Sequence, residues 1–185
     1  MFSEKQLIEM KGGHMWYVIQ TTSGKEENIK IQCETYLPAG LVEKYVIPLY
    51  EERRRFHGAW HTLQKKLFPG YVFFISDQAD ELFLQLKKVP AMTKMLGTGD
   101  EIVALTPQEI EFILRFCGED DIAEISEGVI ENDQVHILSG PLMGLEGAIR
   151  KIDRHKRKAW LQMEMFGRKQ QIEVGLEIIK KIENK

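Results

Sequence analysis

The stretch LFPGYVF, residues 67–73, decides how the front half of this chain folds. Pro69-Gly70 is a turn signal, and it leads directly into residues 71–75, a run of aromatic and β-branched side chains. Such a run after a turn predicts a buried strand. Residues 15–21, MWYVIQT, have the same composition and predict a second strand.

The other segments up to Cys117 predict helices and strands around these two. Apolar residues at helical spacing predict helices over residues 25–36 and 79–87. Residues 106–109, TPQE, have the pattern of a capping box that begins a helix ending near Cys117. Further strands are expected over residues 44–55, 60–67 and 93–96, with a turn at 57–59. Together they predict an α+β domain over residues 15–117, an antiparallel sheet with flanking helices, after an N-terminal tail at 1–14.

Beyond residue 117 the composition changes. Residues 119–127 hold five acids and no base, so residues 118–127 are predicted to be an acidic linker. Short strands are then expected at residues 134–138, 148–152, 158–166, 170–174 and 178–182. Five short strands in fewer than 60 residues predict a small all-β barrel over residues 128–185.

The formal net charge of −3 conceals an uneven distribution. Residues 128–185 carry 11 Lys or Arg and 8 Asp or Glu, whereas residues 1–127 carry 14 and 20. An acidic front and a basic back indicate two modules with different partners.

The densest charge lies in residues 150–158, RKIDRHKRK, which hold six Lys or Arg, one His and one acid. The run falls between two expected strands, so its centre is predicted to be a loop tip. Crowded like charges repel, and an anionic partner such as nucleic acid relieves that repulsion. Guanidinium groups suit phosphate contacts and stacking on bases. The alternative is a solvated turn. A second basic run, residues 53–55 with 65–66, either lies near nucleic acid or keeps an exposed hairpin soluble.

Several classes of protein and site are not supported by the sequence. There is no nucleophile elbow, phosphate-binding loop or dinucleotide loop, so we expect no enzymatic activity and no cofactor. Cys33 and Cys117 are expected to be reduced and buried, and His57 with His61 does not predict a metal site. No membrane span or export signal is found, so the cytoplasm is the expected location.

The quoted motifs resemble those of one family. Residues 16–18, 24–26 and 67–73 resemble the N-terminal domain of NusG-type transcription elongation factors. Residues 128–152, centred on SGPLMGLEG at 139–147, resemble a KOW domain. The likeness covers residues 15–182. Residues 152–159, IDRHKRKA, with 125–129 and 174–178, are similar to LoaP, a specialised antiterminator branch.

The resemblance implies partners and residue roles. The N-terminal domain would dock on the clamp helices of bacterial RNA polymerase through an apolar patch: Trp16, Tyr17, Leu67, Phe68 and Tyr71. The KOW domain would bind an RNA hairpin in the nascent leader transcript through basic residues: Arg150, Lys151, Arg154, His155, Lys156, Arg157, Lys158, Arg168 and Lys169. In the alternative, a general elongation factor, the KOW domain docks a partner protein. The unusually basic and aromatic hairpin at residues 53–66 leaves contact with non-template DNA open.

Overall fold

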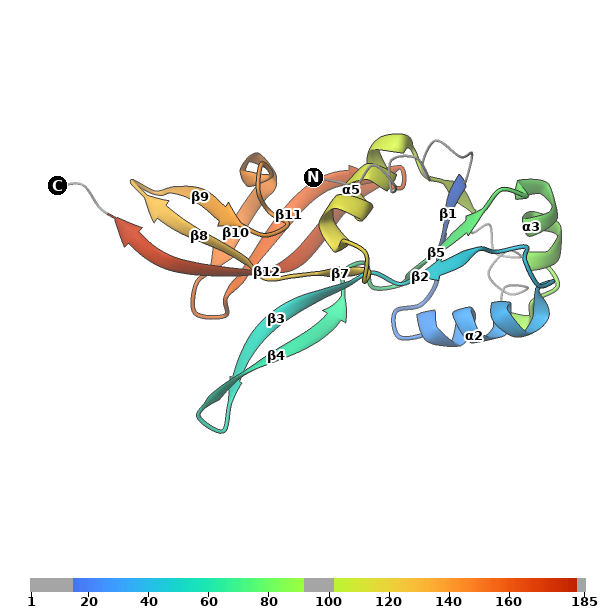
Figure 1. Ribbon diagram of the computed structural model, residues 1–185, viewed down its shortest axis with the longest axis horizontal. Coiled ribbons are helices and arrows are strands. Elements are labelled where there is room, and N and C mark those ends of the chain that lie inside the picture. The colour runs from blue at the N-terminus through green and yellow to red at the C-terminus, as the bar shows by residue number, and fades with distance from the viewer. Residues whose placement is uncertain (1–14, 92–101, 183–185) are drawn as a thin grey trace. The chain divides into compact units, whose positions relative to one another are not determined.

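A computed structural model describes residues 15–91 and 102–182, which form two compact units (Figure 1). The N-terminal unit comprises the chain up to Ile47 and the segment Phe68–Glu111. The C-terminal unit comprises the segment Pro48–Leu67 and the chain from Phe112 onward. The division differs from the expected boundaries at residues 117 and 128, because the segment 48–67 packs with the later half of the chain.

A four-stranded antiparallel sheet forms the centre of the N-terminal unit, with strand order β2-β5-β1-β6. Its strands are β1 (Met15–Gln20), β2 (Lys44–Val46), β5 (Tyr71–Ser76) and β6 (Val103–Ala104). The two strands predicted first, β1 and β5, are direct neighbours, with Tyr17 opposite Phe74. The expected strand at 93–96 lies outside the described residues.

Two helices, α2 (Glu26–Tyr36) and α3 (Ala79–Leu86), pack against one face of this sheet. The sheet contributes Tyr17, Ile19, Val72 and Phe74 to the shared core. The helices contribute a matching set, which includes Ile29, Cys33, Leu82 and Leu86. The predicted α+β character of this part of the chain is therefore present.

The turn before β5 explains why the LFPGYVF stretch needs its glycine. Gly70 has a φ of +84°, which is left-handed, and a Cβ there would lie 2.8 Å from the carbonyl oxygen of Thr21. Its N–H donates to the buried carboxylate of Glu26 at 2.7 Å. Glu26 also accepts the N–H of Gly24 at 2.8 Å. One carboxylate thus joins the turn before α2 to the turn before β5.

Helix α5 (Pro107–Cys117) begins with the predicted capping box. The N–H of Thr106 donates to Glu109 Oε2 at 2.7 Å, and the N–H of Glu109 donates to Thr106 Oγ1 at 3.3 Å. Cys117 at its end and Cys33 in α2 are both buried and reduced, as expected.

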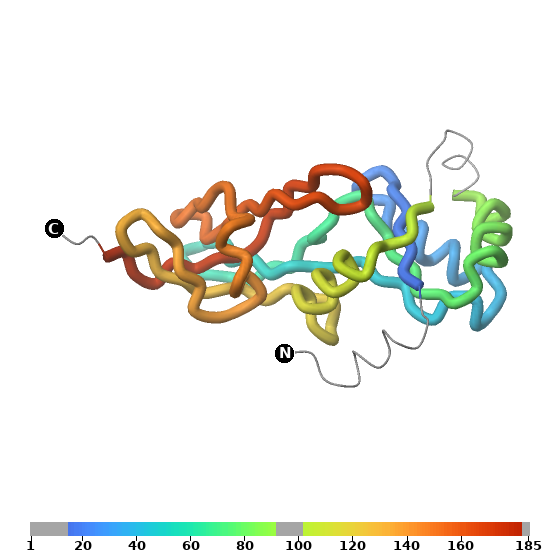
Figure 2. Tube along the Cα trace, turned by 90° about the horizontal axis from the view of Figure 1, so that it is seen from above, coloured from blue at the N-terminus to red at the C-terminus, as the bar shows by residue number. Residues whose placement is uncertain are grey.

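A five-stranded sheet with order β10-β11-β12-β8-β9 forms most of the C-terminal unit (Figure 2). Its strands are β8 (Ser126–Glu131), β9 (Gln134–Ser139), β10 (Ile149–Asp153), β11 (Lys158–Met165) and β12 (Arg168–Ile182). Where two short strands were expected, β12 is one strand of 15 residues, antiparallel to β11 and parallel to β8. Among the described residues β9 and β10 do not pair, so the sheet-rich unit is not the closed barrel that was predicted.

A second sheet in the same unit has the order β4-β3-β7, from β3 (Leu49–Phe56), β4 (Ala59–Lys66) and β7 (Ile122–Ala123). β7 runs parallel to β3 and lies inside the segment predicted to be an acidic linker. The backbone of that segment is paired with β3: Leu49 lies opposite Ile122, and the N–H of Leu49 donates to the carbonyl of Asp121 at 2.9 Å. β3 also lies close to β12 at Gly175. A Cβ on this glycine would lie 2.3 Å from the carbonyl oxygen of Glu51, so only glycine fits there.

Candidate nucleic-acid interface

The basic run forms the predicted loop tip, between the end of β10 at Asp153 and the start of β11 at Lys158. Its single acid shapes the turn: Asp153 Oδ1 accepts the N–H of Lys156 at 2.9 Å, and that hydrogen bond lowers the pKa of Asp153. Arg157 closes the turn with a left-handed φ of 53°. The side chains of Arg154, His155 and Lys156 are thereby left exposed at the tip.

Arg157 faces the protein instead of the solvent. Its guanidinium carbon lies 3.7 Å from the centroid of the Trp60 ring, and its Nη1 lies 2.9 Å from Glu177 Oε1. Arg53 also pairs with Glu177, at 3.4 Å. Glu177 therefore holds one arginine from the basic loop beside one from the β3–β4 hairpin.

Lys158 differs most from its predicted role. Its side chain is only 14% exposed and pairs with both Glu52 and Glu173, the latter at 2.6 Å. Glu52 is 1% exposed and also pairs with Lys65 at 2.9 Å. The hydroxyl of Tyr50 donates to Glu173 at 2.6 Å. Two carboxylates already neutralise the Lys158 charge, which leaves none for RNA.

The pKa values in this buried network follow from its pairs. Burial alone would raise the pKa of Glu52, but hydrogen bonds from Lys158 and Lys65 lower it overall. The pKa of Glu173 is lowered in the same way, against burial, by Lys158 and Tyr50. Burial opposes the charge of Lys158, and the same two carboxylates raise its pKa overall. Glu52, Glu173 and Lys158 are thus all charged at neutral pH.

The other predicted RNA-binding residues lie at different distances from the loop tip. The Arg150 guanidinium donates to the Gly147 carbonyl at 3.0 Å, and Lys151 Nζ lies 4.8 Å from the Trp160 ring centroid. Arg168 and Lys169 lie beyond the opposite end of β11, since Arg168 pairs with Met165 in the register. At about 3.4 Å per residue, the eight-residue strand separates them from the loop by roughly 24 Å. They do not extend the loop patch.

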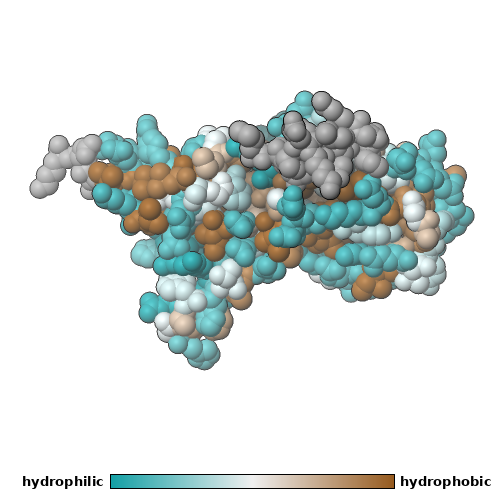
Figure 3. Space-filling view, viewed as in Figure 1, coloured by the Kyte–Doolittle hydropathy of each residue, from teal (hydrophilic) through white to brown (hydrophobic). Residues whose placement is uncertain are grey.

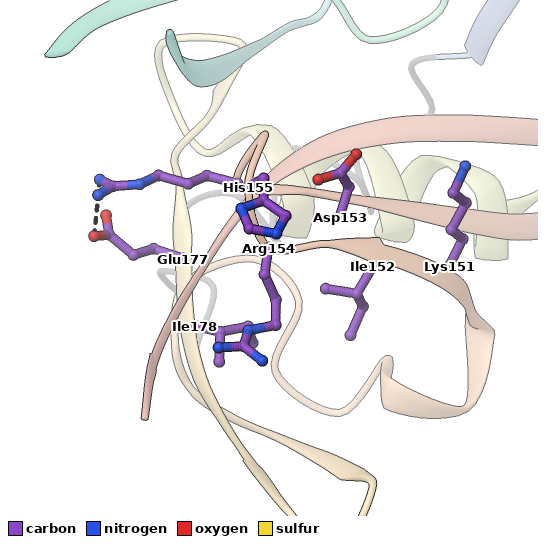
Figure 4. Close-up of a pocket in the computed structure, with 8 residues that line it drawn as sticks. Lys151, Ile152, Asp153, Arg154, His155, Glu177 and Ile178 are labelled. Atoms are coloured by element: carbon purple, nitrogen blue, oxygen red, sulfur yellow. Dashed lines mark ion pairs between the residues drawn. The ribbon is translucent and has the colours of Figure 1, made fainter. Parts of the chain in front are cut away.

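A hollow of about 690 Å³ lies beside the loop (Figure 4). Figure 4 shows Lys151 at one end of the drawn residues and Glu177, with its arginine ion pair, at the other. Ile152 and Ile178 provide apolar lining, and Arg154 and His155 provide polar lining. An apolar lining among hydrogen-bond donors is chemistry that suits a nucleobase.

The residues predicted for the polymerase face are all buried in this structure, with 2–7% of their surface exposed. Neighbouring strand residues point to opposite faces, so Trp16 and Tyr17 cannot share one docking surface. Tyr17 lies on the helix-covered side, where its ring meets Phe83 edge-on at 5.4 Å. Tyr71 is on the same face as Trp16, because Tyr71 pairs with Gln20 in the register. Phe68 contacts Phe73, which also lies on that face, at 5.8 Å.

The sequence predicted a basic and aromatic hairpin at residues 53–66, but not how the aromatic side chains near its tip are arranged. Phe56 and His61 stack at 3.7 Å between centroids with an interplanar angle of 12°. Trp60 is 39% exposed even with Arg157 over its ring. In Figure 3 the hairpin surface is coloured mostly teal to white, that is, hydrophilic to neutral. The alternation of side chains along residues 53–61 indicates that two sets lie on opposite faces of the hairpin. The pairing of β3 with β4 is needed to say which residues belong to each set.

Metal-binding clusters and membrane-spanning helices were sought among the residues that the structure describes. Within residues 15–91 and 102–182, no group of three or more His, Cys, Asp or Glu side chains is placed to hold a metal ion. No helix in these same ranges is both long and apolar enough to cross a membrane.

Comparison with known proteins gives concordant matches. The family model described as "Transcription termination factor nusG" matches residues 14–114. The proteins named "Transcription termination/antitermination protein NusG" from Staphylococcus carnosus and Staphylococcus aureus are each 32% identical over 183 residues, covering 95% of this chain and all of theirs. A solved structure titled "Domain interaction in Thermotoga maritima NusG" matches with a TM-score of 0.51 and 26% identity, over 88% of this chain and 93% of that one.

Proposed function

Because the chain belongs to the NusG family of transcription termination and antitermination factors, we propose that it is a LoaP-type antiterminator that binds RNA polymerase and a leader RNA hairpin. The N-terminal unit would bind the polymerase and the basic loop the RNA. The factor has no chemistry of its own in this proposal. It acts by favouring the elongating state of the polymerase over the paused state.

The β10–β11 loop is the single observation that carries the RNA proposal. Arg154, His155 and Lys156 are exposed at a turn that Asp153 holds in shape. Ordered cations on a preformed loop bind phosphate without the entropic cost of ordering a flexible segment. The hollow beside them supplies a place for an unpaired base. The RNA-binding set is thus reduced to the loop tip, with Lys158, Arg168 and Lys169 removed from it.

For the polymerase we propose the sheet face opposite α2 and α3, which carries Trp16 and Tyr71. Apolar side chains on this face have the composition of a protein-docking surface. Since both are buried in the described structure, docking requires that this face become exposed. Tyr17 supports the fold from the other face and takes no part.

A second candidate function, a general elongation factor whose C-terminal unit docks a protein, is favoured by a different surface. Leu138 in β9, Met143 and Ile179 in β12 are exposed apolar residues of this unit. Figure 3 shows hydrophobic residues gathered over the β8–β9 end. An apolar patch of this kind suits a protein better than an RNA.

The test is binding of the full chain to a pool of stem-loop RNAs that share one stem and carry randomised loops, with duplex DNA as competitor. Arg154→Ala and Lys156→Ala should each weaken RNA binding about fivefold or more, as the loss of one charged contact predicts. Lys169→Ala is the matched control at the far end of β11 and should change affinity little. Equal affinity of all three variants and wild type would exclude the loop as the RNA-binding element.

A further inference from the structure

The β3–β4 hairpin and the basic loop contact each other through the Arg157 guanidinium, whose carbon lies 3.7 Å from the centroid of the Trp60 ring. Glu177 reinforces the junction, since it pairs with Arg157 from the loop and with Arg53 from the hairpin. Gly175 allows β3 to lie close to β12 behind this contact. The hairpin and the loop therefore present adjoining surfaces within the C-terminal unit.

The register of the hairpin decides which of its residues share that surface. Arg55 lies directly opposite Trp60 and Arg54 directly opposite His61. Residues directly opposite in an antiparallel pair share a face, and neighbours along a strand do not. Arg55 is therefore on the Trp60 face, beside the loop. Arg54 is on the opposite face, with the stacked Phe56 and His61 rings.

We propose that Trp60 and Arg55 form the second half of the RNA-binding surface, with the loop tip Arg154, His155 and Lys156 as the first half, and that this second half takes unpaired bases. The inference rests on the proposed function and extends it to a segment outside the basic loop. The Trp60 indole provides a stacking platform, and the Arg55 guanidinium provides a phosphate or base contact.

Geometry and charge favour single-stranded RNA as the occupant. Trp60 remains 39% exposed although Arg157 already covers part of its ring, so part of the residue remains accessible to a base. Arg157 holds the indole in place, which removes the cost of ordering it on binding. Arg55 and Arg154 are exposed cations around these groups, whereas a protein-docking surface is depleted of charge at its core.

The experiment compares neighbouring residues of the full chain in the same stem-loop RNA binding assay. Arg55→Ala and Trp60→Ala should each weaken binding about tenfold, as the loss of one contact or one stacked base predicts. Arg54→Ala, the adjacent arginine on the other face, should weaken it less than about twofold. Trp60→Phe keeps a ring under Arg157 and should retain most of the affinity. The same stem, prepared as a blunt-ended RNA duplex without the loop, should bind Trp60→Ala and wild type equally well.

The outcomes separate this inference from the proposed function. If Arg154→Ala weakens binding but Arg55→Ala has the same effect as Arg54→Ala, the hairpin surface is refuted while the loop stands. If Arg55→Ala and Trp60→Ala weaken binding and Arg154→Ala does not, the hairpin surface is supported and the loop proposal fails. If Trp60→Ala weakens binding to the loopless stem equally, base stacking is refuted. Melting curves identify any variant that unfolds. If Trp60→Ala does, the RNA affinities of Trp60→Phe and Arg55→Ala test the hairpin surface in its place.

Discussion

Replacing Lys158 by Met tests the buried charge network most directly. The substitution keeps the aliphatic length and removes the ammonium that pairs with Glu52 and Glu173. Glu52, which is 1% exposed, then keeps the ion pair with Lys65, and Glu173 keeps the hydrogen bond from Tyr50. A buried carboxylate that loses one of two charged partners costs about 2–4 kcal/mol. We expect a loss of about 3 kcal/mol in the free energy of unfolding of the C-terminal unit.

Urea unfolding followed by tryptophan fluorescence measures this loss, because Trp60 and Trp160 both lie in the C-terminal unit. Lys156→Met is the matched control: its side chain is 72% exposed, and the change should cost less than about 0.5 kcal/mol. Adding Glu52→Gln to Lys158→Met should recover part of the loss, since the unpaired charge is then gone. The two variants should rank in the opposite order for RNA affinity. Lys156→Met should bind RNA more weakly than wild type, and folded Lys158→Met should bind it about as well as wild type. A Lys158→Met protein as stable as Lys156→Met would refute the network as described.

Three further predictions concern stability. Gly70→Ala should cost about 2–4 kcal/mol, because it adds a Cβ clash to left-handed strain, whereas Gly24→Ala, with open space around it, should cost about 1 kcal/mol; equal urea midpoints would contradict this. Thr106→Ala removes an N-cap and should cost about 1 kcal/mol, seen as a lower Tm, and Thr106→Ser should restore it. Glu52 and Glu173 have lowered folded pKa values, so their stabilisation is present above the ordinary value of 4.5 and is lost as pH falls below it; an acid titration in which wild type and Glu52→Gln lose stability in parallel would exclude this.

Local sequence signals predict the helices and strands of the N-terminal unit well because the pattern that identifies each one lies within a short stretch of sequence. The β1 and β5 runs, the helices α2 and α3 and the Thr106–Glu109 capping box can each be identified from spacing alone. The loop tip between β10 and β11 follows in the same way, from a basic run between two strands.

Long-range pairings could not be predicted from those signals. β7 lies in an acidic stretch that is typical of a linker, yet its backbone pairs with β3 more than seventy residues earlier in the chain. The charge of Lys158 suggests a ligand, yet its partners are Glu52 and Glu173, which only the fold brings near. Charge counts cannot distinguish a free cation from a paired one. The same limit led to Arg168 and Lys169 being assigned to a patch at the wrong end of β11.

The position of β12 has a consequence for the order of folding. This strand lies in the middle of its sheet but is the last one made, at residues 168–182. The β3–β4 hairpin leaves the ribosome more than a hundred residues earlier and must wait for it, since the Tyr50–Glu173 bond spans 123 positions. Contacts so distant in sequence form slowly, because a long loop must close before they stabilise anything. During synthesis the N-terminal sheet can therefore assemble while the aromatic hairpin is still unpartnered, and the C-terminal unit forms only after translation has passed β12.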